Sequence, residues 1–296
     1  QNGAWHLGGL PISPSDLAHR VDVVWNLSEP RFSNILESFS VRTIGAPAFS
    51  SFVGGSREML REHMKKIGIN LPRHIILSQY QADLDGPRDR YAIHKAKEVF
   101  EKFGAPWVVK PARNAFSIAD AGGSFPEDLN MGPVRGREGS QRPSASNGMG
   151  VHVAKVFGEL SEAILDGVSH GASILVEELI PGTEAEVHTV AGFRGEDIYV
   201  FPVRETPTPQ AKILGSGSRP QASGEKVTRL ARDLHKHLGA KSYLNSRFVF
   251  HPRRGVYLTG LGFLPNLKNN SHFHQSCELI GARAQHIIEH MLENVM

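Results

Sequence analysis

The stretch "ILVEELIPGTEAEV", residues 174–187, decides the fold of this chain. An apolar run of strand length ends in Glu177 and Glu178, a Pro-Gly pair predicts a turn, and a second run with two-residue alternation begins near Glu184. At such a strand exit, backbone groups and carboxylates can hold the amino group of an adenine and the hydroxyls of a ribose. An acidic hairpin on the surface explains the same pattern without a ligand.

A second candidate lies upstream, at the end of the apolar strand "PWVVKP", residues 106–111. Lys110 ends this strand, and a glycine-rich segment that closes in "SNGMGV", residues 146–151, follows it. A lysine beside a loop whose N–H groups surround anionic oxygens is a reasonable phosphate site. A surface lysine is the alternative. Residues 112–147 contain too little apolar material to pack, so we expect a flexible lid loop there.

The rest of the chain alternates helices and strands. Residues 21–56 combine short strands with a short helix, and the later strands show the two-residue alternation of antiparallel sheets. The helix predicted over residues 91–104 has a buried stripe made of Ala92, Ala96, Val99, Phe100 and Phe103. One closing helix is expected from about residue 275 to the end. The predicted fold class is α+β after an α/β start.

The composition is that of a core-forming globular protein, with 40% apolar residues among 296 and a net charge of +3. The positive excess is spread along the chain, which argues against a nucleic-acid partner. No window approaches the roughly 18 apolar residues of a membrane-spanning helix, so we expect no membrane partner and a cytoplasmic location. Cys277 is the only cysteine, which excludes an internal disulfide. The chain starts at Gln1 without a methionine, so we expect an N-terminal piece to be absent.

The order of the motifs is more specific than any one of them. After "PWVVKP" and the loop ending in "GMGV" come the stretch 174–187, "GFRGEDIYVFPVRE" at 192–205, "YLNSRFVFHPRRGVYL" at 243–258 and "LPNL" at 264–267. This order resembles the D-alanine–D-alanine ligase family of ATP-grasp enzymes over nearly the whole chain. The resemblance implies an ATP-grasp fold, with two α+β subdomains around a nucleotide cleft and a partial α/β subdomain before them. The implied boundaries are 1–56, 57–178 with the lid at 112–147, and 179–296.

The resemblance implies that a nucleotide pocket is retained. In that family, ATP phosphorylates the carboxylate of one D-alanine, and the amine of a second D-alanine displaces the phosphate. Lys110 corresponds to the lysine that contacts the ATP phosphates, and Glu184 corresponds to the acid that binds the ribose. Glu177 and Glu178 correspond to positions around the adenine, and Ile180 to its apolar neighbour. ATP is therefore the implied cofactor.

The phosphate and lid motifs depart from the family pattern. Arg57 stands where the family's Met-Asp-Lys motif has a phosphate-contacting lysine, which keeps a positive charge but changes its geometry. We keep Arg57 as a nucleotide-binding candidate. The family's lid motif Gly-Ser-Ser-Val-Gly-Val corresponds to residues 146–151, and both of its serine hydroxyls are missing here.

The catalytic and metal positions depart further. Asn245 stands where the family has the arginine that stabilises the tetrahedral oxyanion. The three magnesium ligands of the family, an aspartate, a glutamate and an asparagine, are replaced in that order by Arg247, Gly260 and Gly262. Ser271 survives near the D-alanine carboxylate site. No position is therefore assigned as catalytic, and Asn245 and Ser271 are regarded as degenerate positions.

These replacements argue against ligase chemistry. Magnesium is a hard cation that needs oxygen ligands, so the loss of three ligands and the gain of Arg247 predict that it is not bound in the family manner. Loss of the oxyanion arginine alone should lower the rate by roughly 10²–10³, by analogy with removal of one oxyanion donor. The leading hypothesis is an ATP-grasp ligase homologue that keeps the base and ribose pocket but is a poor or inactive ligase.

Two alternatives stay open. The first is a working ATP-dependent D-alanine–D-alanine ligase, or a related carboxylate–amine ligase, of peptidoglycan precursor synthesis, in which Arg247 supplies the charge of the metal. The second is a purely structural protein that has lost nucleotide binding as well. The resemblance leaves a D-alanine-like small molecule and a second copy of the chain open as partners.

Two histidine pairs raise a different metal hypothesis, because histidine is a common metal ligand. His235 and His237 form one pair, and His272 and His274 form the other. Spacing of two residues aligns side chains on a strand, whereas helices are predicted here. We therefore interpret all four as surface histidines.

Overall fold

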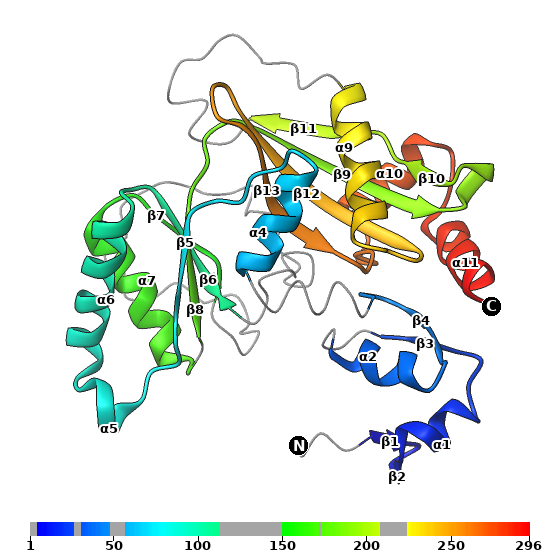
Figure 1. Ribbon diagram of the computed structural model, residues 1–296, viewed down its shortest axis with the longest axis horizontal. Helices are drawn as coiled ribbons and strands as arrows, with labels where there is room; N and C mark the ends of the chain where they lie inside the picture. The colour runs from blue at the N-terminus through cyan, green and yellow to red at the C-terminus, as the bar shows by residue number, and fades with distance from the viewer. Residues whose placement is uncertain (1–4, 27–30, 48–56, 113–149, 172, 208–223) are drawn as a thin grey trace. The chain divides into compact units, whose positions relative to one another are not determined.

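The computed structural model describes residues 5–26, 31–47, 57–112, 150–171, 173–207 and 224–296. The chain divides into two compact units (Figure 1): unit 1 comprises Gln1–Leu71 with Pro181–Met296, and unit 2 comprises Pro72–Ile180. Of the lid predicted at 112–147, all but Ala112 lies outside the described residues. The predicted boundaries 1–56, 57–178 and 179–296 stay predictions. Among the described residues, the helices are too short or too polar to cross a membrane.

Unit 2 is built on a four-stranded sheet whose strands pair in the order β5-β8-β6-β7. Every pair in this sheet is antiparallel, as the two-residue alternation predicts. Its elements are β5 (His74–Leu77), α5 (Ala82–Asp85), α6 (Arg88–Lys102), β6 (Trp107–Pro111), β7 (His152–Ala154), α7 (Phe157–Ser169) and β8 (Ile174–Glu178).

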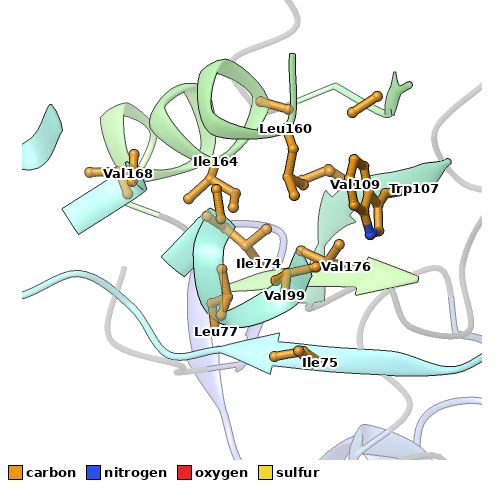
Figure 2. Close-up of a cluster of buried hydrophobic side chains, with 14 of the residues drawn as sticks. Ile75, Leu77, Val99, Trp107, Val109, Leu160, Ile164, Val168, Ile174 and Val176 are labelled. Carbon is orange, nitrogen blue, oxygen red and sulfur yellow. The ribbon is translucent and has the colours of Figure 1, made fainter. Parts of the chain in front are cut away.

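The core of unit 2 lies between one face of this sheet and helices α6 and α7 (Figure 2). Val99 of α6 and Ile164 of α7 meet strand residues such as Val109 and Val176 there. Because side chains alternate along a strand, the neighbours of these strand residues project from the opposite face. Lys110 is one of those neighbours, so it lies on the face that the two helices leave uncovered.

The buried stripe predicted on α6 is right at four positions and wrong at Phe100. The four buried positions are Ala92, Ala96, Val99 and Phe103. Their spacing of four, three and four residues keeps to one face of a helix. Phe100, one residue past that face, is 54% exposed, and its ring packs edge-on against that of Phe157 at the margin of the core.

Unit 1 is built on a five-stranded antiparallel sheet with the order β10-β9-β12-β13, in which β11 also pairs with β9. The elements of this part are α4 (Arg57–Lys66), β9 (Thr183–Ala191), a 3₁₀ turn η2 (Phe193–Gly195), β10 (Ile198–Val200), β11 (Arg204–Pro207), α9 (Gly224–His237), β12 (Tyr243–His251), β13 (Gly255–Gly262), α10 (His272–Leu279) and α11 (Ala284–Val295). The antiparallel pairing predicted for the second half of the chain is confirmed.

Helices cover both faces of this sheet. Val190 of β9 belongs to an apolar cluster that includes Phe273 of α10 and Ile287 of α11. The preceding residue, Thr189, points the other way, and its hydroxyl lies 2.8 Å from Nδ1 of His235 on α9. Strand alternation therefore assigns every second residue of β9, including Glu184, Glu186 and His188, to the face that α10 covers.

The N-terminal part of unit 1 is a small α/β arrangement. It contains β1 (Trp5–Leu7), β2 (Leu10–Ile12), α1 (Pro14–Ala18), β3 (Val23–Trp25), α2 (Arg31–Ser38) and β4 (Arg42–Ile44). Strands β3 and β4 pair in parallel, with α2 between them along the chain. A parallel pair needs such a crossover connection, so the predicted α/β start is confirmed.

The single closing helix predicted from about residue 275 is wrong. The structure has two helices there, because α10 ends at Leu279 and α11 begins at Ala284. Gly281 lies between them with a φ of 70°. This left-handed conformation suits glycine and terminates a helix.

Candidate functional site

Two of the predicted nucleotide-site residues form a buried ion pair in unit 2. Nζ of Lys110 lies 2.5 Å from Oε2 of Glu177, and the two side chains are 5% and 7% exposed. Lys110 comes from β6 and Glu177 from the neighbouring strand β8, where it pairs with Val108. The pair lies on the sheet face opposite helices α6 and α7. A buried lysine is tolerated when a carboxylate neutralises it, so each residue fixes the position of the other.

Glu178 is held by a residue that the sequence analysis missed. Nε of Arg73 donates to Oε2 of Glu178 at 2.8 Å, and the backbone N–H of Glu178 donates to the carbonyl of Arg73 at the same distance. Ile180 follows in the chain and is buried, at 2% exposure. Lys110, Glu177, Glu178 and Ile180 thus all belong to unit 2.

Glu184 belongs to unit 1. It lies on β9, opposite Val249 of β12. Burial raises the pKa of its carboxyl group, although the positive charge of Arg247 acts against that shift. Arg57 begins helix α4, but its side chain lies outside the described part of the chain, so its role stays a prediction.

The strand register brings the three replaced metal positions to neighbouring places in unit 1. Arg247 lies directly opposite Gly260, and Asn245 lies directly opposite Gly262 on the adjacent strand. Both glycines lie within β13 and are buried. They are therefore strand residues that offer no side-chain ligand atom, and neither forms part of a turn.

Arg247 is paired with an acid that the sequence analysis also missed. Its Nε lies 3.5 Å from Oε2 of Glu186, its register partner on β9. The side-chain amide of Asn245 donates to Oε1 of the same carboxylate at 3.0 Å. With a guanidinium at one replaced ligand position and no side chain at the other two, these residues do not fit a magnesium ion bound in the family manner.

Glu186 also contacts His272, which in turn contacts His188. Nδ1 of His272 lies 3.4 Å from Oε1 of Glu186 and 2.9 Å from Nε2 of His188. The other ring nitrogen of His188, Nδ1, lies 2.7 Å from the hydroxyl of Tyr243. Glu186, His188 and His272 form a group whose ligand-type atoms all lie within 4.8 Å of one another. We call this group the β9–α10 cluster.

Burial and neighbouring charges determine the protonation states in and around the β9–α10 cluster. Burial would raise the pKa of Glu186, but the hydrogen bond from His272 and the charge of Arg247 outweigh it and hold the pKa far below its usual range. Burial, reinforced by His272, lowers the pKa of His188 to about 3. Burial also keeps the pKa of Tyr243 well above its ordinary value. The β9–α10 cluster therefore contains an ionised carboxylate and a neutral imidazole, next to the neutral phenol of Tyr243.

The surface interpretation of the histidines is wrong for His235 and His272. His235 is 1% exposed because it lies four residues after Ala231, on the face of α9 that packs against the sheet. The side chain of His272 is 13% exposed because it is the first residue of α10, whose start lies over β9. His237 and His274 are half-buried, and neither belongs to the β9–α10 cluster.

Ser271 has a structural role at the start of α10. Its hydroxyl accepts from the backbone N–H of His274 at 3.3 Å, which makes it the N-cap. The same hydroxyl donates to the carbonyl of Asn266 at 2.7 Å. Ser271 therefore fixes the direction from which α10, and with it His272, approaches the sheet.

Comparison with solved structures identifies the architecture as the ATP-grasp fold. The D-alanyl-alanine synthetase A of Vibrio cholerae O1 biovar eltor is 17% identical, and the match covers 93% of this chain and 76% of that one with a TM-score of 0.57. The D-alanine–D-alanine ligase of Bacillus anthracis, in a complex with ATP, is 16% identical over 96% of this chain and 82% of that one, with a TM-score of 0.59. The chain thus has the form of the ATP-grasp fold found in D-alanine–D-alanine ligases, as the order of its motifs indicates.

Sequence comparison points to the same superfamily. No family model matches the chain. The carbamoyl phosphate synthase large chain of Rubrobacter xylanophilus, also an ATP-grasp protein, is 27% identical over 107 residues. That match covers 36% of this chain and 9% of the synthase chain, so it concerns a small part of the latter.

Proposed function

We propose that this protein binds an adenine nucleotide and does not catalyse magnesium-dependent D-alanine–D-alanine ligation. The observation that carries the proposal is the position of Arg247, which lies opposite Gly260 and is paired with Glu186. A divalent cation at that place would meet a guanidinium and no ligand from β13. Phosphoryl transfer to a carboxylate relies on such a cation to bridge and neutralise the phosphates.

The nucleotide part of the proposal rests on different residues. Lys110 and Glu177 are fixed by their contact on one face of the unit 2 sheet. Glu178, the next residue after Glu177, is held by its ion pair with Arg73. The proposed roles are phosphate contact for Lys110, adenine contact for Glu177 and Glu178, and ribose contact for Glu184. The ATP-bound relative from Bacillus anthracis supports a nucleotide as the ligand of this fold.

Two measurements test the proposal. Titration calorimetry with ATP and with ADP, each with and without magnesium, should show binding that magnesium does not strengthen. A coupled assay of phosphate release with ATP, magnesium and D-alanine should show no release that depends on D-alanine. D-alanine-dependent release would instead support a working ligase in which Arg247 replaces the metal, and failure of both nucleotides to bind would support a purely structural protein.

A further inference from the structure

The β9–α10 cluster brings three metal-ligand side chains to one place on the sheet of unit 1. Glu186 and His188 are two residues apart on β9, so they point to the same face. His272 approaches them from the first position of α10. Two imidazoles and one carboxylate form a ligand set that magnesium does not prefer, since magnesium takes oxygen ligands. Zinc and related transition ions bind this combination of nitrogen and oxygen.

Two of the three distances within the cluster are close to those that one small ion requires, and the third is at most 4.8 Å. Two ligand atoms bound to the same zinc at about 2.0–2.1 Å in tetrahedral geometry lie roughly 3.3 Å apart. The separation between His272 Nδ1 and Glu186 Oε1 is 3.4 Å, and that between His272 Nδ1 and His188 Nε2 is 2.9 Å. The second pair would need to separate by only a few tenths of an ångström.

Tyr243 makes a hydrogen bond with His188 on the side away from the cluster. Metal-bound histidines are commonly oriented by such a residue, which does not itself bind the metal. The hydroxyl oxygen of Tyr243 can accept a hydrogen bond from Nδ1–H of His188, at 2.7 Å, which leaves the lone pair of Nε2 directed at the cluster. The carboxylate of Glu186 has an outer partner as well, because the amide of Asn245 donates to its Oε1. Metal-ligating carboxylates and histidines are characteristically held by such second contacts.

We propose that Glu186, His188 and His272 bind one divalent transition-metal ion of the zinc class, with the fourth position open to water. The open position follows from the partial exposure of Glu186 and His272, whose side chains are 18% and 13% exposed. Three protein ligands with a free fourth place distinguish a reactive zinc site from a closed structural one. The ligands differ from the replaced magnesium positions, which are Arg247, Gly260 and Gly262.

Arg247 allows a further test of the proposed metal site, because its positive charge lies beside the carboxylate of Glu186. A guanidinium 3.5 Å from Glu186 opposes a second cation there. Arg247→Gln should therefore bind zinc more tightly than the unchanged chain does. Tyr243→Phe removes only the outer contact of His188, and it should weaken zinc binding by roughly 10–100-fold.

The experiment is a titration of the whole chain with Zn²⁺ in competition with a chromophoric chelator, and with Co²⁺ followed by visible absorption. We expect one tight equivalent, which His272→Gln and Glu186→Gln abolish. His274→Gln, on the same helix but outside the cluster, is the matched control and should leave that equivalent in place. His272 is partly exposed, so its variant should remain folded, which circular dichroism checks. Absence of a tight equivalent, or an equivalent that survives His272→Gln in a folded protein, would overturn the proposal.

Discussion

Arg247 and Glu186 face each other across strands β12 and β9, with the guanidinium Nε 3.5 Å from the carboxylate. Both side chains are largely buried, at 11% and 18% exposure. The positive charge of Arg247 is thus compensated by a carboxylate on the next strand. Neither charge can be removed alone without leaving the other uncompensated.

Glu186→Gln should destabilise unit 1 by about 3 kcal/mol, because it leaves the largely buried charge of Arg247 without its carboxylate. The measurement is urea unfolding in the presence of a metal chelator, so that bound metal does not contribute. The double variant Glu186→Gln with Arg247→Met removes both charges and should lose less stability than the single one. A single variant within about 0.5 kcal/mol of the unchanged chain would show that the pair contributes little, as exposed pairs do.

The sheets of this fold could be predicted from sequence because their signal is local. Alternation of apolar residues predicts the strands, and the order of the motifs adds the architecture. Residues 183–191 even place Glu184, Glu186 and His188 on one face by simple alternation. Strand alternation therefore already placed Glu186 and His188 on the same face as Glu184, although the sequence analysis singled out only Glu184.

The rest of the candidate site could not be predicted because it depends on contacts that are distant in sequence. His188 meets His272 across 84 residues and Tyr243 across 55. The first contact is set by how α10 docks on the sheet and the second by how β12 pairs with β9, and no local period encodes either. His235 is a different case. Its position four residues after Ala231 continues the apolar stripe of α9, so helical spacing alone could have indicated that it is buried.

Lys110→Met should lower the affinity for ATP by about 10–100-fold, the range expected for loss of one hydrogen bond to a charged group. Because Glu177 would then be buried without its partner, the variant should also be less stable. The double variant Lys110→Met with Glu177→Gln removes that second effect. Calorimetry that compares the double variant with Glu177→Gln alone therefore isolates the phosphate contact, with the exposed Lys97→Met as control. Equal affinity in the double variant and in Glu177→Gln would exclude Lys110 from the nucleotide site.

Gly182→Ala should destabilise unit 1 by about 3 kcal/mol. A Cβ atom at this position would lie 2.2 Å from the backbone carbonyl oxygen of Phe250, and a backbone atom cannot rotate away as a side chain can. Gly158→Ala is the matched control, because a Cβ there meets nothing within 4 Å and alanine favours the helix. Thermal unfolding should therefore show a large loss for the first variant and no loss for the second. Equal melting temperatures would mean that the backbone of the turn after Ile180 shifts to accommodate the added Cβ with little loss of stability.

His235 should contribute to a fall in stability between pH 6.5 and pH 4. Burial lowers its pKa from 6.5 to about 4, and Lys236 adds to this effect while the contact with Ala240 and the charge of Asp197 oppose it. Below pH 6.5 the unfolded chain takes up a proton at this residue, whereas the folded chain stays neutral until about pH 4. The stability present above pH 6.5 is therefore lost progressively as the pH falls.

The size of this effect follows from the shift in pKa. One pKa unit corresponds to about 1.4 kcal/mol, so His235 should account for about 3 kcal/mol of the loss between pH 6.5 and pH 4. His235→Asn cannot take up the proton, and its shorter side chain still offers a group to the hydroxyl of Thr189. Urea unfolding at pH 7 and at pH 4.5 should therefore show a smaller pH dependence in this variant. The exposed His94→Asn is the control and should keep the pH dependence of the unchanged chain. If both variants behave alike, His235 is not the residue whose protonation opposes folding.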